Sequence, residues 1–332
     1  ELLRRINRAP DGTAQLVRMR VDLLKALKAN PELAAVDADF VHLFGSWFSP
    51  AFLELERVNW SSPASLLEQI IRHEAVHAIR DWDDLRRRLQ PDRRCFAFRH
   101  PALPQELLIF VEVALVDAMP DAIAPLLERR EVDARSSNAR FAVFYSISNC
   151  QPGLRGVSLG NFLIKRVCEI LLRENPSVRR FCTLSPMPGF AAWIRSGAPL
   201  DAQRLPRVVV PRIEEARGLA AAALAAGELA ADAERLDKLE PAARDALRRL
   251  AAAYLVATRE TDPASDPVAK FHLNNGARIE RINLLANRSR RGLQESFGTM
   301  VNYLYDLERI EDYHEGFVGG RVAASRDLWG SG

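Results

Sequence analysis

The spacing of apolar residues separates the chain into two regions of different character. Up to about residue 90, apolar positions recur mostly at intervals of three and four, as in Leu66, Leu67, Ile70 and Ile71, which is the repeat of one helix face. From Arg94 onward the apolar residues gather in short runs rich in β-branched and aromatic side chains, a composition typical of buried strands. The pattern therefore predicts a helical N-terminal region followed by a mixed α/β region.

Four apolar runs with little alternation predict central strands of a sheet. They are Cys95–Arg99, Leu107–Val116, Phe141–Ile147 and Phe181–Leu184. A run without alternation indicates that both faces are covered, because a strand with one solvated face alternates apolar and polar residues. Nearer the C-terminus we expect a further strand at Ile279–Leu285 and a final helix at Gly298–Arg309.

An Ala- and Leu-rich stretch at residues 213–258 predicts a helical hairpin that breaks near Lys238–Pro241. We therefore expect an α+β protein, with an all-helical domain at residues 1–92 and a mixed α/β domain at residues 93–330 into which the hairpin is inserted. The chain begins with Glu1 rather than Met, so we also expect that some N-terminal sequence is missing.

Composition narrows the classes of function. The 332 residues include 46 basic and 43 acidic side chains, and the formal net charge of +3 gives no electrostatic reason to expect a nucleic-acid partner. An apolar fraction of 48% excludes a disordered chain, and no apolar run reaches the roughly 20 residues that cross a membrane. The cysteines Cys95, Cys150, Cys168 and Cys182 form no CxxC pair, which argues against a zinc ribbon or disulfide scaffold and fits a cytoplasmic location.

The HExxH motif of zinc peptidases is matched by His73-Glu74-Ala75-Val76-His77. On a helix the two histidines would share one face, and the glutamate could act as a base. A third ligand is required, and the metzincin extension fails because Arg80 stands where glycine is needed; Glu106 or Glu112 could substitute. The competing interpretation, which we favour, is an amphipathic helix with Val76 buried and both histidines on a solvated face.

A GxSxG motif, typical of the hydrolase nucleophile elbow, is matched by Gly156-Val157-Ser158-Leu159-Gly160, and Asp266 and His272 follow in the hydrolase order. An elbow requires the strand to lead directly into the first glycine, whereas the loop Gln151–Arg155 separates the two here. We therefore interpret Ser158 as a helix cap or a ligand contact rather than as a nucleophile.

The loop from Gln151 to Gly156 favours a phosphate ligand instead. A strand, a glycine-bearing turn and a helix N-terminus in succession direct backbone N–H groups at one point, at the positive end of the helix dipole. Further positive charge comes from Arg155, Lys165 and Arg166. The spacing fits neither the dinucleotide nor the triphosphate loop motif. It resembles the pyrophosphate loop of GNAT-like acetyltransferases, Q/R-x-x-G-x-G/A, with Leu154 in place of the first glycine.

Three segments taken together resemble the malonyl-CoA decarboxylase family. They are Gln151–Arg166, Thr183–Phe190 and Asp266–Ala277, and the similarity extends to Gly12–Val17, Trp47-Phe48, Glu56–Val58, Arg281–Asn283 and Asn302–Tyr305. The resemblance implies a helical oligomerisation domain joined to a GNAT-like catalytic domain that uses neither a metal nor another cofactor. We therefore expect malonyl-CoA as the substrate and self-association, as a dimer or tetramer, through the helical domain.

The resemblance also implies the site residues. Ser185 of the SPMPGF segment and His272 of the FHLNNGA segment correspond to the catalytic pair, and Tyr305 to a further active-site position. We add Asn275 as a candidate donor to the thioester oxygen. CoA is expected to bind at Gln151, Gly153, Arg155, Gly156, Val157, Ser158, Leu159, Gly160 and Asn161. Ser158 stands where relatives carry glutamate.

The implied reaction converts malonyl-CoA to acetyl-CoA and CO2, a step of fatty acid metabolism. His272, with an ordinary pKa of about 6.5, would protonate the enolate, while Ser185 would hydrogen-bond the carboxylate or the thioester oxygen and pass protons to or from the histidine. This scheme requires the two side chains to lie in contact, beside the place where the nucleotide docks. The alternatives are a GNAT-type acyltransferase that needs an amine acceptor, a zinc peptidase, and a CoA sensor without catalysis.

Overall fold

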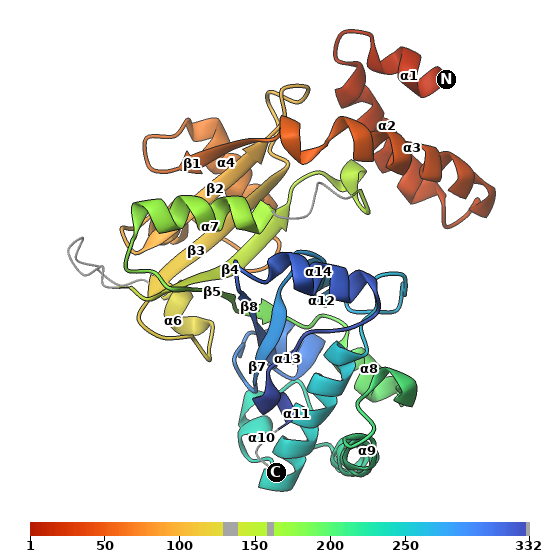
Figure 1. The fold of residues 1–332 in the computed structure, drawn as a ribbon, viewed down its shortest axis with the longest axis vertical. Coiled ribbons are helices and arrows are strands. Elements are labelled where there is room, and N and C mark those ends of the chain that lie inside the picture. The colour runs from red at the N-terminus through yellow and green to blue at the C-terminus, as the bar shows by residue number, and fades with distance from the viewer. Residues whose placement is uncertain (129–138, 158–162, 330–332) are drawn as a thin grey trace. The chain divides into compact units, whose positions relative to one another are not determined.

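The computed structural model describes residues 1–128, 139–157 and 163–329, and the ribbon in Figure 1 traces them. They form two compact units. The first contains the described residues of Glu1–Val113 and Ser146–Leu163, and the second contains those of Ala114–Arg130, Arg135–Tyr145 and Ile164–Gly332. Two strands, β3 (Ile109–Val116) and β4 (Phe141–Asn149), contribute residues to both units.

Helices make up most of the N-terminal part of the first unit. In chain order they are α1 (Leu2–Asn7), α2 (Gly12–Ala26), α3 (Ala34–Trp47), α4 (Ala64–His73) and α5 (Trp82–Arg88). The helical period predicted for this region is confirmed in these segments.

One segment of the predicted helical region is a strand instead. Glu54–Val58 forms β1, which pairs antiparallel with β2 (Arg93–Arg99). The Glu, Leu and Arg residues of β1 favour a helix by local propensity. Backbone pairing with a strand far along the chain fixes the extended conformation, and local periodicity cannot reveal such a partner.

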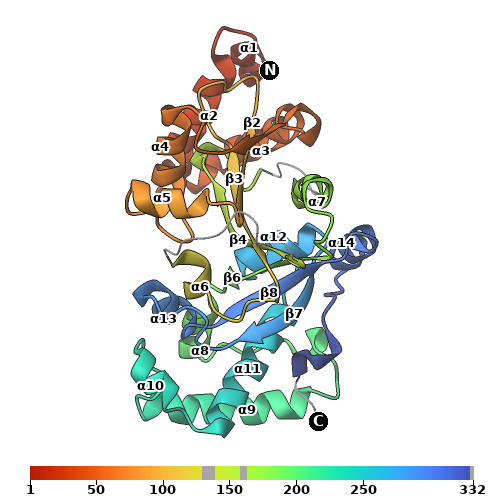
Figure 2. The same cartoon turned by 90° about the vertical axis from the view of Figure 1, so that its left-hand side faces the viewer.

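β8 (Met300–Tyr305) lies in the middle of the second unit's strands. It pairs antiparallel with β7 (Arg278–Asn283) along one edge and with β5 (Arg180–Thr183) and β6 (Ser185–Pro186) along the other. Figure 2 shows β7 and β8 side by side. β5 also pairs parallel with β4. Parallel neighbours need a long crossover, and helix α7 (Leu163–Glu174) lies in that connection.

β8 corrects the helix expected at Gly298–Arg309. All six residues of this strand are buried, and the next helix, α14, spans Ile310–Val318. A short buried strand and a buried helical segment have the same apolar content, so periodicity alone does not separate them. The turn before the strand places Phe297 and Gly298 in the left-handed region, with φ of 52° and 72°, which ends the preceding helix.

The other predicted strands are confirmed as β2, β3, β4, β5 and β7. The predicted hairpin is confirmed as well: α9 (Val210–Ala225) packs against α11 (Pro241–Val256), and α10 (Ala233–Asp237) lies in the connection between them. Proline fits the first position of α11, where a helix has no use for a backbone N–H. The remaining α-helices of the second unit are α6 (Ala124–Leu127), α8 (Phe190–Ser196), α12 (Pro267–Asn274) and α13 (Arg290–Ser296).

α12 matters most for the site, and the apolar pattern does not reveal it. Asp266 caps its N-terminus, because the Oδ1 atom accepts the backbone N–H groups of Val268 and Ala269 at 2.9 and 3.0 Å. Pro267 occupies the first helical position, and Gly276, with φ of 77°, lies just past the helix end. These two ends fix the helix on which His272 stands.

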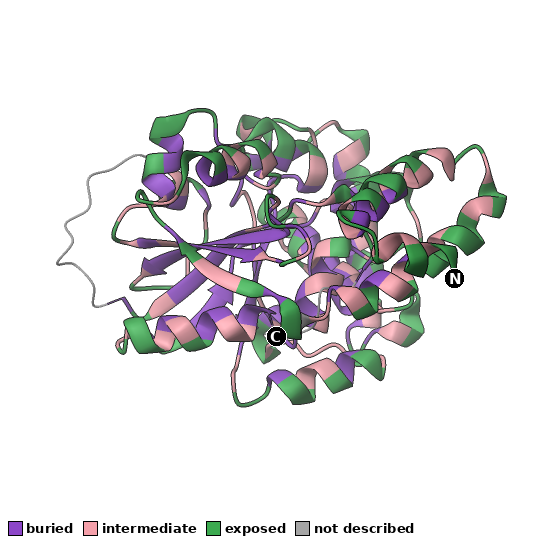
Figure 3. Ribbon diagram, turned by 90° about the horizontal axis from the view of Figure 1, so that it is seen from above, coloured by how far each residue is buried: buried purple, intermediate pink, exposed green. Residues whose placement is uncertain are grey.

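Each unit has its own apolar core. One cluster in the first unit joins α4, α5, β2 and β3, and one in the second unit joins α6, β4, β5 and β8. Figure 3 shows that the strands are mostly buried, whereas many helices keep an exposed face. No helix in the described ranges combines the length and the apolar character that crossing a membrane requires.

Candidate active site

The two predicted catalytic side chains meet in the second unit. Ser185 is the first residue of β6, and His272 lies in the last turn of α12. Ser185 Oγ and His272 Nε2 are 2.9 Å apart, and the two residues expose only 5% and 3% of their surface. The contact that the sequence interpretation requires is therefore present, and it is buried.

Tyr305 and Thr183 extend this pair into a chain of hydrogen bonds. Tyr305 OH lies 2.8 Å from His272 Nδ1, and Ser185 Oγ donates to Thr183 Oγ1 over 2.9 Å. A serine hydroxyl has one hydrogen, so Ser185 must accept from His272 Nε2, which carries the ring proton. His272 Nδ1 is then the acceptor of the Tyr305 hydroxyl. Every donor in the chain points from Tyr305 toward Thr183.

Burial sets the protonation of this cluster. Desolvation lowers the pKa of His272 to about 3 and raises the pKa of the Tyr305 hydroxyl well above its usual value, because both charged forms lose their hydration. Both side chains are therefore neutral at neutral pH. This corrects the expectation that His272 has an ordinary pKa: the ring takes up a proton only when a nearby negative charge offsets the desolvation.

Two further residues of the cluster escape the sequence analysis. Tyr303 stacks on the His272 ring, with centroids 4.5 Å apart and planes at 28°, and its backbone N–H donates to Thr183 Oγ1 over 3.1 Å. Residues two apart in an extended segment point to the same side. Tyr303 is two positions from Tyr305, and Thr183 is two positions from Ser185. The alternation of side chains along a strand therefore predicts that both lie on the same face as the predicted site residues.

Asn302 holds the segment that carries Thr183. Its Nδ2 donates to the carbonyl oxygens of Thr183 and Pro120 at 2.8 and 3.1 Å. Its Oδ1 accepts from Arg281 Nε and Asn283 Nδ2 at 3.1 and 2.8 Å. The fully buried amide of Asn302 thus uses both hydrogens and both lone pairs, which fixes β8 against the end of β5.

Asn275 has a structural contact in the described structure. Its Nδ2 donates to the carbonyl oxygen of Phe271 over 2.8 Å, and its backbone N–H bonds to the carbonyl oxygens of Phe271 and His272. These bonds close the C-terminal end of α12 beside His272. The predicted donation from Asn275 to a thioester oxygen stays a prediction.

The predicted CoA-binding positions follow β4 in the first unit. Gln151 Nε2 donates to the carbonyl oxygen of Leu107 over 2.8 Å, and Gly153 and Val157 are buried. Gly156 has a φ of 75°, a conformation that glycine adopts without steric cost. Ser158, Leu159, Gly160 and Asn161 lie outside the described residues.

The HExxH segment lacks the geometry of a zinc helix. α4 ends at His73, and Glu74 is extended, so the two histidines do not share a helix face. The Glu74 carboxylate is a buried acceptor for the N–H groups of Val76 and His77 at 2.7 and 2.8 Å and for the Ser146 hydroxyl at 2.7 Å. The amphipathic helix that we favoured is also wrong here, because His77 is buried. Within the described ranges, no three His, Cys, Asp or Glu residues are grouped to hold a metal ion.

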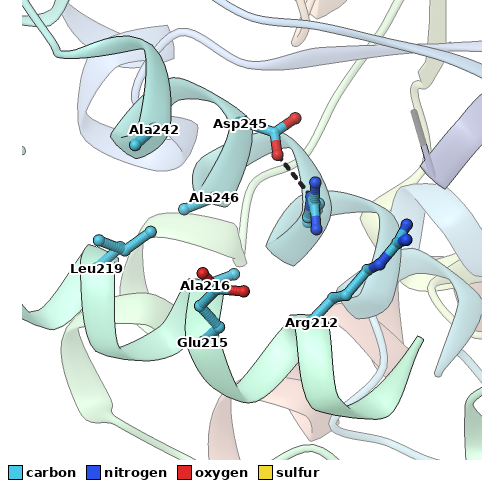
Figure 4. Close-up of a pocket in the computed structure, with 8 residues that line it drawn as sticks. Arg212, Glu215, Ala216, Leu219, Ala242, Asp245 and Ala246 are labelled. Carbon is cyan, nitrogen blue, oxygen red and sulfur yellow. Dashed lines mark ion pairs between the residues drawn. The ribbon is translucent and has the colours of Figure 1, made fainter. Parts of the chain in front are cut away.

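A surface groove in the second unit is lined by charged and aliphatic residues of two helices. It has a volume of about 120 Å³ and lies between α9 and α11, as Figure 4 shows. Its charged residues are Arg212, Glu215, Asp245 and Arg249, of which Asp245 pairs with Arg249 over 2.6 Å. The other lining residues are aliphatic: Ala216, Leu219, Ala242 and Ala246. The groove contains none of the predicted site residues.

Comparison with known proteins gives the class and then the family. The chain matches the family model of the malonyl-CoA decarboxylase C-terminal domain over residues 51–330 and that of the N-terminal domain over residues 1–48. The chain is thus an enzyme of two parts, a helical N-terminal region and a mixed α/β domain. The chain belongs to the malonyl-CoA decarboxylase family, which confirms the resemblance and the predicted class of enzyme, a carboxy-lyase.

Individual relatives agree with this assignment. The mitochondrial malonyl-CoA decarboxylase of Anser anser anser is 37% identical over 98% of this chain and 68% of its own length. The crystal structure of malonyl-CoA decarboxylase from Rhodopseudomonas palustris is 48% identical, with a TM-score of 0.82 over 99% of this chain and 78% of that chain. The enzyme from Cupriavidus metallidurans is 43% identical, with a TM-score of 0.81 over 98% and 80%. The predicted α+β fold class, with a helical N-terminal part followed by a mixed α/β domain, is confirmed.

Proposed function

We propose that this chain decarboxylates malonyl-CoA to acetyl-CoA and CO2, with Ser185 and His272 as its catalytic pair. Membership of the family supports the reaction. The observation that carries the assignment of the pair is the 2.9 Å contact between Ser185 Oγ and His272 Nε2. It brings a hydroxyl and an imidazole from distant parts of the sequence into one buried site, and general acid–base catalysis needs groups within this reach.

The reaction places two demands on the site. The bond between the carboxylate carbon and the α-carbon breaks, CO2 leaves, and the electron pair passes into the thioester as an enolate. The α-carbon then takes a proton, so each turnover consumes one proton. The enzyme accelerates these steps by stabilising the negative oxygen and by delivering the proton. We assign the oxygen contact to Ser185, whose hydroxyl hydrogen turns from Thr183 to the substrate oxygen, and the proton to His272.

The lowered pKa of His272 makes its protonation depend on the substrate. The ring is neutral in the free protein, because its pKa is about 3. A malonyl carboxylate or an enolate beside the ring raises this pKa, since a nearby negative charge favours the imidazolium form. His272 thus gains a proton when the anion is present and loses it to the α-carbon. Tyr305 keeps the ring oriented through Nδ1 over 2.8 Å.

Activity measurements on single variants test the assignment. Acetyl-CoA formed from malonyl-CoA is measured for the wild type, Ser185→Ala and His272→Asn. We expect kcat to fall by roughly 10²–10⁴ in each variant with little change in KM, because the lost interactions act in the transition state. Exposed residues provide the controls, Ser61→Ala and His42→Asn, for which wild-type rates are expected.

The same assay separates the alternatives. Wild-type turnover by either site variant would refute the catalytic pair. Consumption of acetyl-CoA in the presence of an amine, without release of CO2 from malonyl-CoA, would identify an acyltransferase instead. The specific prediction is that acetyl-CoA accumulates as a product and that no amine is needed.

Four broader features are proposed with the reaction. We place CoA at the loop that begins at Gln151. We also propose that the helical domain, residues 1–92, joins chains into a dimer or tetramer. Light scattering after size exclusion measures this oligomeric state. The four cysteines are free and buried, and this supports a reducing compartment such as the cytoplasm. The proposed place in metabolism is the turnover of malonyl-CoA in fatty acid metabolism.

A further inference from the structure

Arg20 of α2 is a buried arginine that hydrogen-bonds to the predicted CoA-binding loop. Only 1% of its surface is exposed. One guanidinium nitrogen, Nη1, donates to the carbonyl oxygens of Gly153 and Arg155, each over 2.8 Å. The other side of the guanidinium faces the Asp37 carboxylate of α3, with Nε and Nη2 at 2.8 and 3.3 Å from its two oxygens. Arg20 therefore joins two helices to one loop.

The energetics of this arrangement indicate a specific role. A buried guanidinium is costly unless a carboxylate and further acceptors replace its hydration. Asp37 supplies the opposite charge, and the two loop carbonyls supply the remaining acceptors. The two bonds to the loop are charge-assisted and are stronger than neutral hydrogen bonds. They fix the carbonyl oxygens of Gly153 and Arg155 toward α2.

This fixed direction also orients the opposite side of the loop. In a trans peptide the C=O and the following N–H point in opposite directions. Because Arg20 binds the carbonyl oxygen of Arg155, the N–H of Gly156 points away from α2. Gly153 lies so close to α2 that a Cβ atom there would be 2.2 Å from the carbonyl oxygen of Val17. One side of the loop is thus held against α2, and the N–H group of Gly156 faces the other side.

We infer that Arg20 is a positioning residue that holds the loop Gln151–Gly156 in the conformation that binds the CoA diphosphate. The inference rests on the proposed function of the loop, and it assigns a role to the helical N-terminal region beyond self-association. An N–H group aimed outward by a locked loop binds an anion without the entropy cost of ordering that loop. Loss of Arg20 should therefore weaken CoA binding while the Ser185–His272 pair stays intact.

The test compares Arg20→Met with Arg20→Lys and with Arg18→Met, a matched substitution at an exposed position of the same helix. Kinetics with malonyl-CoA give KM and kcat, calorimetry gives the Kd for CoA, and hydrogen exchange reports on the backbone amides of the loop. For Arg20→Met we expect a rise of tenfold or more in KM and Kd, a change in kcat of less than threefold, and faster exchange at Leu154 and Val157. Arg20→Lys should recover part of the affinity, because it keeps a cationic donor.

The outcomes separate this inference from the proposed function. Arg18→Met should match the wild type in every measurement. If Arg20→Met keeps the wild-type Kd and loop exchange, or loses kcat alone, Arg20 is not a positioning residue. If the wild type does not decarboxylate malonyl-CoA, the proposed function fails, while CoA affinity and loop exchange still decide the role of Arg20. Asp37→Asn leaves the two hydrogen bonds from Arg20 to the loop carbonyl oxygens in place. It should therefore weaken CoA binding less than Arg20→Met does.

Discussion

At the scale of single residues, the hydroxyl of Tyr305 is the group that fixes the orientation of His272. It donates to Nδ1 over 2.8 Å, and this bond leaves the proton on Nε2, the atom that faces Ser185. Without that donor, the imidazole can turn or change tautomer. The catalytic role that we propose for His272 therefore depends on a residue that needs no contact with the substrate.

Replacing Tyr305 with Phe removes only this donor. We expect kcat to fall by roughly 10–100-fold with KM changed by less than about threefold, because His272 is misoriented during proton transfer. The pH profile of kcat should shift, since the pKa of the bound imidazole changes with its partner. Tyr313→Phe, on α14, serves as the control. A variant with wild-type kcat and pH profile would contradict the orienting role.

The buried histidine also predicts how stability depends on pH. The folded pKa of His272 is about 3, against 6.5 for an ordinary imidazole. Between these values the unfolded chain binds a proton that the folded protein does not, so this group's contribution to stability falls as the pH falls from about 6.5 toward 3, by about 1.4 kcal/mol per unit.

Urea unfolding at several pH values measures this effect as a difference between two proteins. His272→Gln has no titrating ring, so its free energy of unfolding should decline less steeply below pH 6.5 than that of the wild type. Other titrating groups are common to both and cancel in the difference. Parallel curves for the two proteins would show that His272 does not carry a depressed pKa.

At the scale of elements, the end of α12 controls the position of His272. Gly276 has a φ of 77°, and a Cβ atom there would lie 2.2 Å from the carbonyl oxygen of Ile310. Gly276→Ala should therefore lower the free energy of unfolding by about 1–3 kcal/mol and reduce kcat, through strain at the helix end. Gly45→Ala in α3, where the added Cβ meets nothing within 4 Å, should be neutral or stabilising. Equal effects in thermal unfolding would contradict this account.

A buried ion pair fixes α5 against β3 in the first unit. Arg88 Nη1 lies 2.7 Å from Glu112 Oε2, with side chains 4% and 0% exposed, so Glu112 has a structural contact rather than the zinc-ligand role considered for it. Glu112→Gln should destabilise the protein by about 3–5 kcal/mol, because Arg88 loses its carboxylate in a dry environment.

Chemical unfolding of a matched variant provides the comparison. Asp22→Asn removes the carboxylate of an exposed pair with Lys25, and we expect a change of less than about 1 kcal/mol. If Glu112→Gln is no more harmful than Asp22→Asn, the buried pair contributes no more than a surface pair.

Elements were predictable from the sequence where the signal is local. Apolar runs without alternation predict β2 to β5 correctly, because a strand covered on both faces needs no polar positions. β1 and β8 could not be predicted in this way. The Glu-Leu-Glu-Arg sequence of β1 favours a helix until β2 pairs with it. All six residues of β8 are buried, so this short, mostly apolar segment has no alternation to distinguish it from a buried helix.

The candidate site shows the same division. Ser185, His272 and Tyr305 follow from the resemblance of short segments to a known family, and their contacts agree with it. Thr183 and Tyr303 carry no motif of their own and become evident only when their strand positions are known. The depressed pKa of His272 depends on burial, which no single segment of the sequence reveals.

At the scale of the whole molecule, the chain divides its work between two compact units. The described part of the proposed CoA loop belongs to the first unit, together with α2 and Arg20, and the Ser185–His272 pair belongs to the second. Substitutions at Arg20 in the first unit should therefore change KM and the Kd for CoA, whereas substitutions at Ser185 or His272 in the second unit should change kcat.

A double-mutant cycle on kcat tests the central claim most directly. If Ser185 and His272 act as one unit, the variant carrying both Ser185→Ala and His272→Asn should be no more than about threefold slower than the slower single variant, because removing either member already disables the pair. Losses that multiply, so that the double variant falls by the product of the two single effects, would show that the residues act independently and would contradict the proposed mechanism.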